Sequence, residues 1–398
     1  MVAELTVDTI EAKLGDYLQN VYRDLHQNPE LSTQEFETQA FIKTELDKLN
    51  IPYKIMAKTG LCAEIRGGQP GKTVLLRADI DALAIHEQTG LEYASKKEGI
   101  MHACGHDAHT TVGLGVAALL QERAQDLKGN IKIMFQPSEE MPPGGAKFMI
   151  EEGILENPKV DAAIGIHTNP YLLAGQIGLK DGYILANTDR IFISLIGKGG
   201  HAAAPQEGID AIAMAGQFIA GIQNIVARQV SPLDRAVITL GKISGGYTPN
   251  SIADQVELAG TVRTIKAETQ SHIENQIARL LQSVTGFWGG TYKYEYRKGH
   301  PATWNDKRMV DLVRRATAEC LGAESIIELD NPYMSGDDFT YLAQAVPSVF
   351  IEWGTATEGK ENFAWHHPKF HVNLSSLKYG VAVVTQSIVH FLNEEAGV

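Results

Sequence analysis

Apolar positions repeat with two different periods along the first part of the chain. Residues 62–67, 73–79 and 130–135 are short apolar runs bounded by glycine, lysine or proline, a pattern typical of strands. Between the last two runs, residues 109–128 carry apolar side chains at helical spacing. Strands that alternate with helices in this way predict parallel βαβ units.

The pattern changes in the middle of the chain. Strands are predicted at 191–197, 235–243, 253–265 and 291–297, and helices at 208–228 and 268–284. Their order, β-α-β-β-α-β, is the split ferredoxin-like arrangement. We therefore predict an α/β fold, in which a mostly parallel sheet flanked by helices is built from residues 1–183 plus 300–398. A ferredoxin-like α+β domain, residues 184–299, is inserted into it, since 398 residues exceed one ordinary core.

Chemically active side chains stand at the ends of the predicted parallel strands. Asp79 and Asp81 end one strand, Glu139 and Glu140 follow the next, and His167 ends a third. Each of these positions alone is compatible with a turn or with a solvated surface. Because parallel strands bring their carboxyl ends to one edge of a sheet, we expect the five side chains to converge.

A cluster of histidines and one cysteine lies at residues 102–109, in the loop before a predicted helix. The sequence HACGHDAH combines a thiol, three imidazoles and a carboxylate, and Cys104 and His106 are separated by one residue. These are metal-ligand types. Taken alone, the cluster is also compatible with a cysteine nucleophile beside a histidine base, or with a buried structural cluster.

Other polar residues are less informative one by one. They are His201 in a glycine-rich turn, Asn250, Arg263 late in a strand, and the adjacent His366 and His367. For each of those in the inserted domain, taken alone, a structural role is favoured over a functional one. His26 has no ligand type beside it in sequence, so we interpret it as a packing or surface histidine.

Composition narrows the range of partners. The formal net charge is −13, which argues against nucleic acids and anionic membranes as partners. The first residues do not have the pattern of a secretory signal, and no apolar run is long enough to span a bilayer. Three widely spaced cysteines do not form a disulfide framework, so we expect a reducing, cytoplasmic setting.

Several of these segments resemble motifs of a known family. MHACGHDAHT, LLRADIDAL, FQPSEE, GKGGHAAAP, GTVRT and WHHPKF are similar to motifs of the M20 metallopeptidase family. The match is to its amidohydrolase branch, with hippurate hydrolases, N-acetyl-diaminopimelate deacetylases and auxin-conjugate hydrolases. The resemblance implies a zinc-peptidase-like catalytic domain and an inserted lid and dimerisation domain. It also implies two divalent metals per subunit, held by Cys104, His106, Glu140, His167 and His366, with Cys104 as the bridge.

The resemblance also implies roles for other residues. Glu139 would be the general base and acid, and Asp81 would orient a metal ligand. His201 would reach the active site of the other subunit of a homodimer. Asn250 and Arg263 would hold the carboxylate or the polarised oxygen of a small-molecule substrate. His366 fits the family pattern better than His367, and His102 and His109 would have supporting roles.

The expected reaction is metal-dependent hydrolysis of the amide bond of N-acyl amino acids. Manganese and zinc are the favoured metals, and nickel and cobalt also fit the ligand types. Arg263 suits a substrate carboxylate because a planar guanidinium can bind both oxygens. Two alternatives stay open: a metal-binding scaffold without catalysis, and a cysteine hydrolase using Cys104. The second leaves Glu139, Glu140 and His167 without a role.

Overall fold

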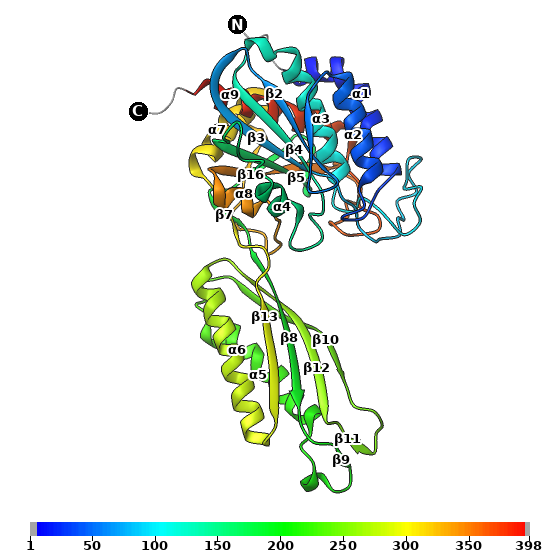
Figure 1. The fold of residues 1–398 in the computed structure, drawn as a ribbon, viewed down its shortest axis with the longest axis vertical. Helices are drawn as coiled ribbons and strands as arrows, with labels where there is room; N and C mark the ends of the chain where they lie inside the picture. The colour runs from blue at the N-terminus through cyan, green and yellow to red at the C-terminus, as the bar shows by residue number, and fades with distance from the viewer. Residues whose placement is uncertain (1–5, 395–398) are drawn as a thin grey trace. The chain divides into compact units, whose positions relative to one another are not determined.

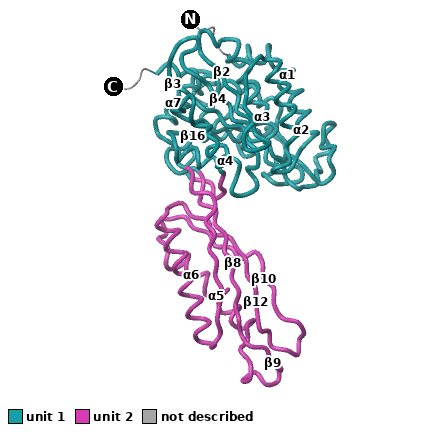
Figure 2. Tube along the Cα trace, in the orientation of Figure 1, with its two compact units in different colours: residues 1–184, 304–331, 338–398 teal, residues 185–303, 332–337 magenta. Residues whose placement is uncertain are grey.

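The computed structural model describes residues 6–394 and divides them into two compact units (Figure 2). Unit 1 contains residues 6–184, 304–331 and 338–394, and unit 2 contains residues 185–303 and 332–337. The boundaries expected from the sequence were 183/184 and 299/300. The sequence did not indicate that residues 332–337 group with unit 2.

An eight-stranded sheet forms the centre of unit 1 (Figure 1). Its strands lie in the order β1 (Tyr53–Met56), β2 (Gly60–Arg66), β4 (Lys128–Gln136), β3 (Gln69–Asp79), β5 (Ala162–Leu173), β16 (Ser348–Ala356), β6 (Ile177–Leu179) and β15 (Ile326–Glu328). The four central strands β4, β3, β5 and β16 are parallel. Strands β1, β2 and β6 pair antiparallel with their inner neighbours. The predicted α/β fold with a mostly parallel central sheet is confirmed.

Helices cover both faces of this sheet. The helices of unit 1 are α1 (Val7–Gln27), α2 (Phe36–Lys48), α3 (His106–Glu122), α4 (Gly145–Glu151), α7 (Lys307–Leu321), α8 (Thr340–Ala345) and α9 (Leu377–Asn393). Gly113 of α3 packs against Ala78 and Phe135, which therefore face the α3 side. Arg77, one residue before Ala78, is the register partner of Gly165, which packs against Phe339 just before α8. Successive strand residues point to opposite faces, so α8 lies on the other side.

Unit 2 has the split ferredoxin-like order. Its elements in sequence are β8 (Asn187–Ile196), α5 (Ala211–Gln229), β10 (Ala236–Gly245), β12 (Gln255–Thr264), α6 (Ala267–Trp288) and β13 (Thr291–Arg297). The strands form an antiparallel sheet in the order β10-β12-β8-β13. Alternate residues of β8, Ile191 and Ile193, share one buried cluster with Phe218 of α5 and Ile277 of α6. Both helices therefore pack on the same face of the sheet, as the period-two pattern requires.

Short elements complete the chain. They are β7 (Gly182–Leu185), β9 (Gly200–His201), β11 (Ser251–Ile252), β14 (Thr303–Asn305) and the 3-10 turns η1 (Ala124–Asp126), η2 (Pro205–Glu207), η3 (Ala323–Ser325) and η4 (Leu374–Ser376). Strand β9 pairs with β11, and β7 pairs with β14. Between residues 6 and 394, no helix has the length and apolar character needed to cross a membrane.

The start of α3 brings the histidine–cysteine cluster to the carboxyl edge of the central strands. Gly105, which precedes the helix, has φ of 89°, a conformation that favours glycine. A Cβ atom here would also lie 2.6 Å from Oγ1 of Thr168 on β5. The turn between Cys104 and His106 therefore depends on glycine, and it sets the first turn of α3 against the end of β5.

Candidate metal centre

Residues predicted to converge do meet at one edge of the unit 1 sheet. Several groups of three side chains have their ligand-type atoms within 4.8 Å of one another, and two of these groups share Cys104. One group is Cys104, His106 and His167, and the other is Cys104, Glu140 and His366. Because the Cys104 thiol belongs to both groups, the arrangement offers two adjacent metal sites that share one sulfur ligand.

Orphaned polar atoms at this edge fit metal ligands. Within residues 6–394, His106 Nε2 and Glu140 Oε1 are buried and have no hydrogen-bond partner. His366 Nε2 lies 3.1 Å from the same Glu140 oxygen, although the pair does not have the geometry of a hydrogen bond. An unsatisfied buried polar atom costs about 1–3 kcal/mol, so these atoms are better explained as ligands for a cation.

Negative charge accumulates around His106. Burial lowers the pKa of its imidazole, but the charges of Asp79, Asp81 and Glu140 raise that pKa to about 10. His106 Nδ1 lies 3.2 Å from Asp81 Oδ1, and His106 Nε2 lies 3.4 Å from Asp79 Oδ2. A buried excess of carboxylates suits a divalent cation, which would balance their charge.

Asp81 holds both the His106 ring and the loop that carries the two glutamates. Its Oδ1 accepts the backbone N–H of Glu139 at 3.1 Å, and its Oδ2 accepts that of Glu140 at 3.0 Å. Ser32 donates its hydroxyl to Asp81 Oδ2 at 2.6 Å. Burial alone would raise the pKa of Asp81, but the hydrogen bonds from His106 and Ser32 lower it below its usual value. Asp81 is therefore a charged acceptor that fixes four neighbours at once.

His167 presents one ring nitrogen to the cluster. Its Nδ1 donates to the carbonyl oxygen of Thr168 at 2.8 Å, which leaves Nε2 3.6 Å from Cys104 Sγ. Burial holds the pKa of His167 well below its usual value, so the imidazole is neutral. A neutral ring whose Nε2 lone pair points toward the Cys104 thiol is the form that binds metals.

His109 supports this arrangement and has both ring nitrogens engaged. Its Nδ1 donates to Asp79 Oδ1 at 2.5 Å, and its Nε2 accepts the backbone N–H of Thr168 at 2.8 Å. Asp79 in turn binds Arg77 Nη1 at 2.7 Å, and Arg77 Nη2 donates to Asp338 at 3.1 Å. The roles of Arg77 and Asp338 were not predicted from the sequence. A charged residue inside the apolar run LLRAD was the available signal.

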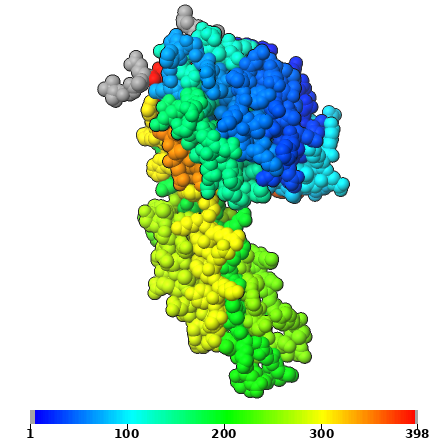
Figure 3. Space-filling view, viewed as in Figure 1, coloured from blue at the N-terminus to red at the C-terminus, as the bar shows by residue number. Residues whose placement is uncertain are grey.

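His26 is a buried packing histidine, one of the two places expected for it from the sequence. It is 1% exposed, and its Nδ1 lies 2.6 Å from Asp107 Oδ2 while its Nε2 lies 3.2 Å from Glu87 Oε1. Burial lowers the pKa of His26, but the hydrogen bonds to Asp107 and Glu87 raise it to about 9. Glu87 belongs to a loop, residues 84–100, that lies against the N-terminal helices, shown in blue in Figure 3. His26 therefore ties this loop to the first turn of α3.

Three predicted site residues belong to unit 2. His201 is exposed in β9, and its Nδ1 accepts the backbone N–H of Ala203 at 3.0 Å. Asn250 is exposed and accepts a hydrogen bond from Thr248. The half-buried guanidinium of Arg263 contacts the carbonyl oxygens of Asp189 and Val262 at 3.4 and 3.3 Å. These three residues are described only within unit 2.

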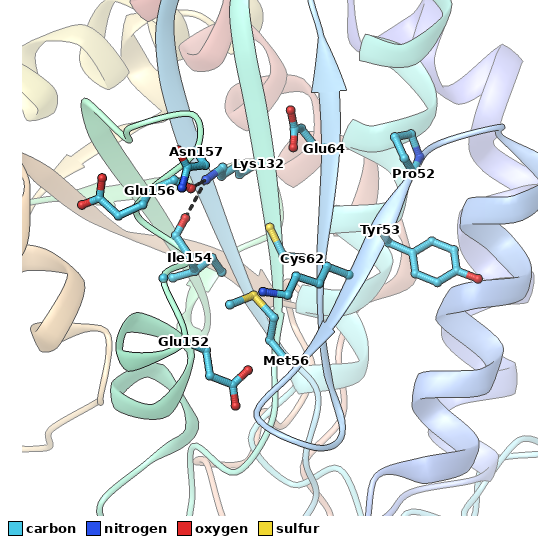
Figure 4. Close-up of a pocket in the computed structure, with 12 residues that line it drawn as sticks. Pro52, Tyr53, Met56, Cys62, Glu64, Lys132, Glu152, Ile154, Glu156 and Asn157 are labelled. Carbon is cyan, nitrogen blue, oxygen red and sulfur yellow. Dashed lines mark hydrogen bonds between the residues drawn. The ribbon is translucent and has the colours of Figure 1, made fainter.

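A separate cavity of about 400 Å³ lies against β1, β2 and β4 (Figure 4). It contains Cys62 and Lys132, but none of the predicted site residues. Lys132 Nζ donates to the carbonyl oxygens of Ile154 and Glu156 at 2.8 and 2.6 Å. The buried ammonium thus anchors the turn that forms one wall of the cavity, and burial raises the pKa of the Cys62 thiol to about 11. Cys62 is therefore a neutral thiol, unlike a metal ligand.

Known proteins are similar in sequence to this chain over most of its length. An N-acetyl-L-cysteine deacetylase of Bacillus subtilis is 42% identical over 92% of this chain and 85% of its own. An IAA-amino acid hydrolase of Arabidopsis thaliana is 37% identical over 95% of this chain and 86% of its own. An N-acetyldiaminopimelate deacetylase of Priestia megaterium is 35% identical over 94% of this chain and 98% of its own.

Solved structures extend the comparison. A dinuclear metal binding peptidase of the M20 family from Bacillus subtilis has a TM-score of 0.83 and 35% identity, covering 96% of this chain and 99% of that one. The sequence pattern of peptidase family M20/M25/M40 matches residues 75–390, which include every predicted metal ligand. The chain belongs to this family, within its amidohydrolase branch, and is a hydrolase of amide bonds.

Proposed function

We propose that the protein hydrolyses the amide bond of N-acyl amino acids at a centre of two divalent metals. The observation that carries this proposal is the Cys104 thiol, which is shared by two three-residue groups of potential ligands. The relatives of this chain that are called deacetylases or an amino acid hydrolase support the substrate class. Zinc and manganese suit a set of one thiolate, three imidazoles and one carboxylate.

The proposed ligands divide into the same two groups. His106 and His167 would hold one metal and Glu140 and His366 the other, with Cys104 between them. When bound, the metals would supply Lewis acidity that polarises the scissile carbonyl and makes water nucleophilic at neutral pH. His366, rather than His367, is assigned here because its Nε2 approaches Glu140.

Glu139 is the proposed proton carrier. Its backbone is held by Asp81, and it forms a further close group with His106 and Glu140. A Glu139 carboxylate oxygen would take a proton from the attacking water and deliver it to the amide nitrogen that leaves. Because Glu140 is proposed as a ligand, the two adjacent glutamates have different tasks.

The remaining roles require unit 2 and a second copy of the chain. We propose that the chain works as a homodimer in which His201 donates to the developing oxyanion of the partner's substrate. Asn250 and Arg263 would bind the substrate carboxylate. Arg263 suits this task because, within residues 6–394, its guanidinium donates to two backbone carbonyls through Nη1 and keeps other N–H donors for a ligand.

Metal content and activity together test the proposal. We expect chelation to abolish hydrolysis of N-acetyl-L-cysteine and N-acetylglycine, and added zinc or manganese to restore it. Cys104→Ala is expected to lose at least one metal per chain by elemental analysis, whereas Cys62→Ala, in the separate cavity, retains both. Activity that survives chelation but not alkylation of Cys104 would instead support a cysteine hydrolase. A metal-loaded chain that cleaves no N-acyl amino acid would leave only a metal-binding scaffold.

A further inference from the structure

We propose that Tyr171 and Trp365 form an aromatic ledge beside the metal centre that binds an apolar, planar group of the substrate. The inference rests on the proposed function, because it takes His167 and His366 as metal ligands. It goes further by assigning residues that select among N-acyl amino acids.

Trp365 contacts one proposed ligand, precedes another in the chain, and has a fixed orientation. Its indole Nε1 donates to the carbonyl oxygen of Thr168 at 2.8 Å, and the same oxygen accepts His167 Nδ1 at 2.8 Å. The Trp365 ring stands edge-on to the His167 ring, with centroids 5.6 Å apart and planes at 74°. The next residue in the chain is His366. The indole is therefore anchored to the strand that carries one ligand and to the loop that carries another.

Tyr171 extends this aromatic surface outward. Its ring stands edge-on to Trp365, with centroids 5.4 Å apart and planes at 81°. Its backbone N–H donates to Oδ1 of the buried Asn169 at 2.9 Å, and Asn169 is itself held by Glu352. Even so, 64% of Tyr171 is exposed. A large aromatic side chain held in place yet exposed next to a reaction centre is typical of a binding surface.

The chemistry of the ledge selects flat apolar groups. Two rings packed edge to face present ring surface to a third, and an aromatic pair contributes about 0.5–1.5 kcal/mol beyond its buried area. An acyl group such as benzoyl and an amino-acid side chain such as phenylalanine both offer this surface. An acetyl group attached to glycine is too small to cover two rings.

Paired substrates measure the contribution of the ledge. The ratio of kcat/KM for N-benzoylglycine over N-acetylglycine reports an aromatic acyl group. The same ratio for N-acetyl-L-phenylalanine over N-acetylglycine reports an aromatic side chain. In Tyr171→Ala we expect one of these ratios to fall about tenfold. Tyr171→Phe, which keeps the ring, should keep both ratios, and so should Phe287→Ala, which removes an even more exposed aromatic ring (76%) on α6 of unit 2.

A fall in the first ratio shows that the acyl group lies on the ledge, and a fall in the second shows that the amino-acid side chain does. The proposal is wrong if both ratios in Tyr171→Ala equal those of the wild type. If both kcat/KM ratios fell in Phe287→Ala as well, the effect would reflect general aromatic content. That result would also overturn the proposal.

Binding without turnover separates the ledge from the proposed reaction. In a metal-loaded Glu139→Gln background, calorimetric titration gives the Kd of the same three compounds. We expect Tyr171→Ala to weaken binding of one aromatic compound about tenfold relative to N-acetylglycine. This measurement decides the role of Tyr171 even if the wild-type protein hydrolyses none of the three, an outcome that refutes only the proposed function. Equal relative affinities in Glu139→Gln with and without Tyr171→Ala would refute the ledge itself.

Discussion

Two neighbouring glutamates at the metal centre differ because of what surrounds each carboxylate. Glu140 Oε1 is buried, has no hydrogen-bond partner and lies 3.1 Å from His366 Nε2. Glu139 instead belongs to a close group with His106 and Glu140. Asp81 fixes both backbone N–H groups, so the two side chains start from one rigid turn. Adjacent positions along an irregular turn point in different directions, which allows one ligand and one proton carrier.

Glu139→Gln should separate proton transfer from metal binding. The amide keeps the size of the side chain but cannot take a proton, so kcat is expected to fall about 10²–10⁴-fold. Elemental analysis should still find two metals per chain. Glu152→Gln, an exposed change in the separate cavity, is the matched control and should keep full activity. Substantial activity in Glu139→Gln would refute its assignment as the general base.

A second prediction at the residue scale concerns the buried ion cluster of His26. Asp107 and Glu87 face this imidazole, together with Tyr22, Tyr93 and the neutral His102. The pKa of His26 is raised from 6.5 in the unfolded chain to about 9 in the folded one. Its contribution to stability is therefore fully present below pH 6.5 and is lost as the pH rises through 9.

His26→Gln should lower the free energy of unfolding by about 3 kcal/mol at pH 7, because it leaves two buried carboxylates without a cation. The difference between wild type and variant in urea titrations should shrink as the pH rises from 6.5 through 9. His86→Gln, an exposed change, should show no such difference. A wild-type advantage that is constant from pH 6 to pH 10 would contradict a protonated His26.

At the scale of elements, the site depends on how α3 begins. Gly105 has a positive φ, and a Cβ there would lie 2.6 Å from the Thr168 hydroxyl oxygen. Gly99 also has a positive φ, 76°, but a Cβ there would meet nothing within 4 Å. Substitutions at these two glycines therefore distinguish two effects of an added Cβ atom. One is backbone strain, which costs about 1–2 kcal/mol per residue, and the other is a clash where α3 approaches β5.

We expect Gly105→Ala to bind metal at least tenfold more weakly than wild type, because the clash moves Cys104 and His106 away from His167. Gly99→Ala should be destabilised only by the backbone strain and should keep the metal affinity of the wild type. Competition with a fluorescent chelator measures both affinities. Equal affinities in the two variants would show that the glycine is needed for backbone conformation alone.

How much the sequence reveals depends on how far apart the interacting residues lie in it. Local periodicity predicted the α/β sheet and the split ferredoxin-like order of unit 2, because a period of two or 3.6 residues is visible within one element. The meeting of Cys104 with Glu140 followed from strand ends at one sheet edge. The ion pair of Arg77 with Asp338 joins residues from opposite ends of the chain, and no local pattern marks it. The partners of His26 were not predicted for the same reason, since Asp107 and Glu87 lie far from it in sequence.

At the scale of the whole molecule, the two units have separate hydrophobic cores. The core of unit 1 and that of unit 2 have no residue in common among those described in 6–394. All five proposed metal ligands belong to unit 1. Metal binding should therefore stabilise one core directly and leave the other unchanged.

Calorimetry with and without chelator tests this separation. A ligand that binds only the folded state stabilises it by about 2.7 kcal/mol at a free concentration 100 times Kd, which raises the Tm of a domain of this size by several degrees. We expect two unfolding transitions, of which chelation lowers only the one belonging to unit 1. Cys104→Ala should place that transition at the chelated position and make it insensitive to zinc. If both transitions moved together by the same amount, the two cores would unfold as one unit, and metal binding would stabilise the entire chain.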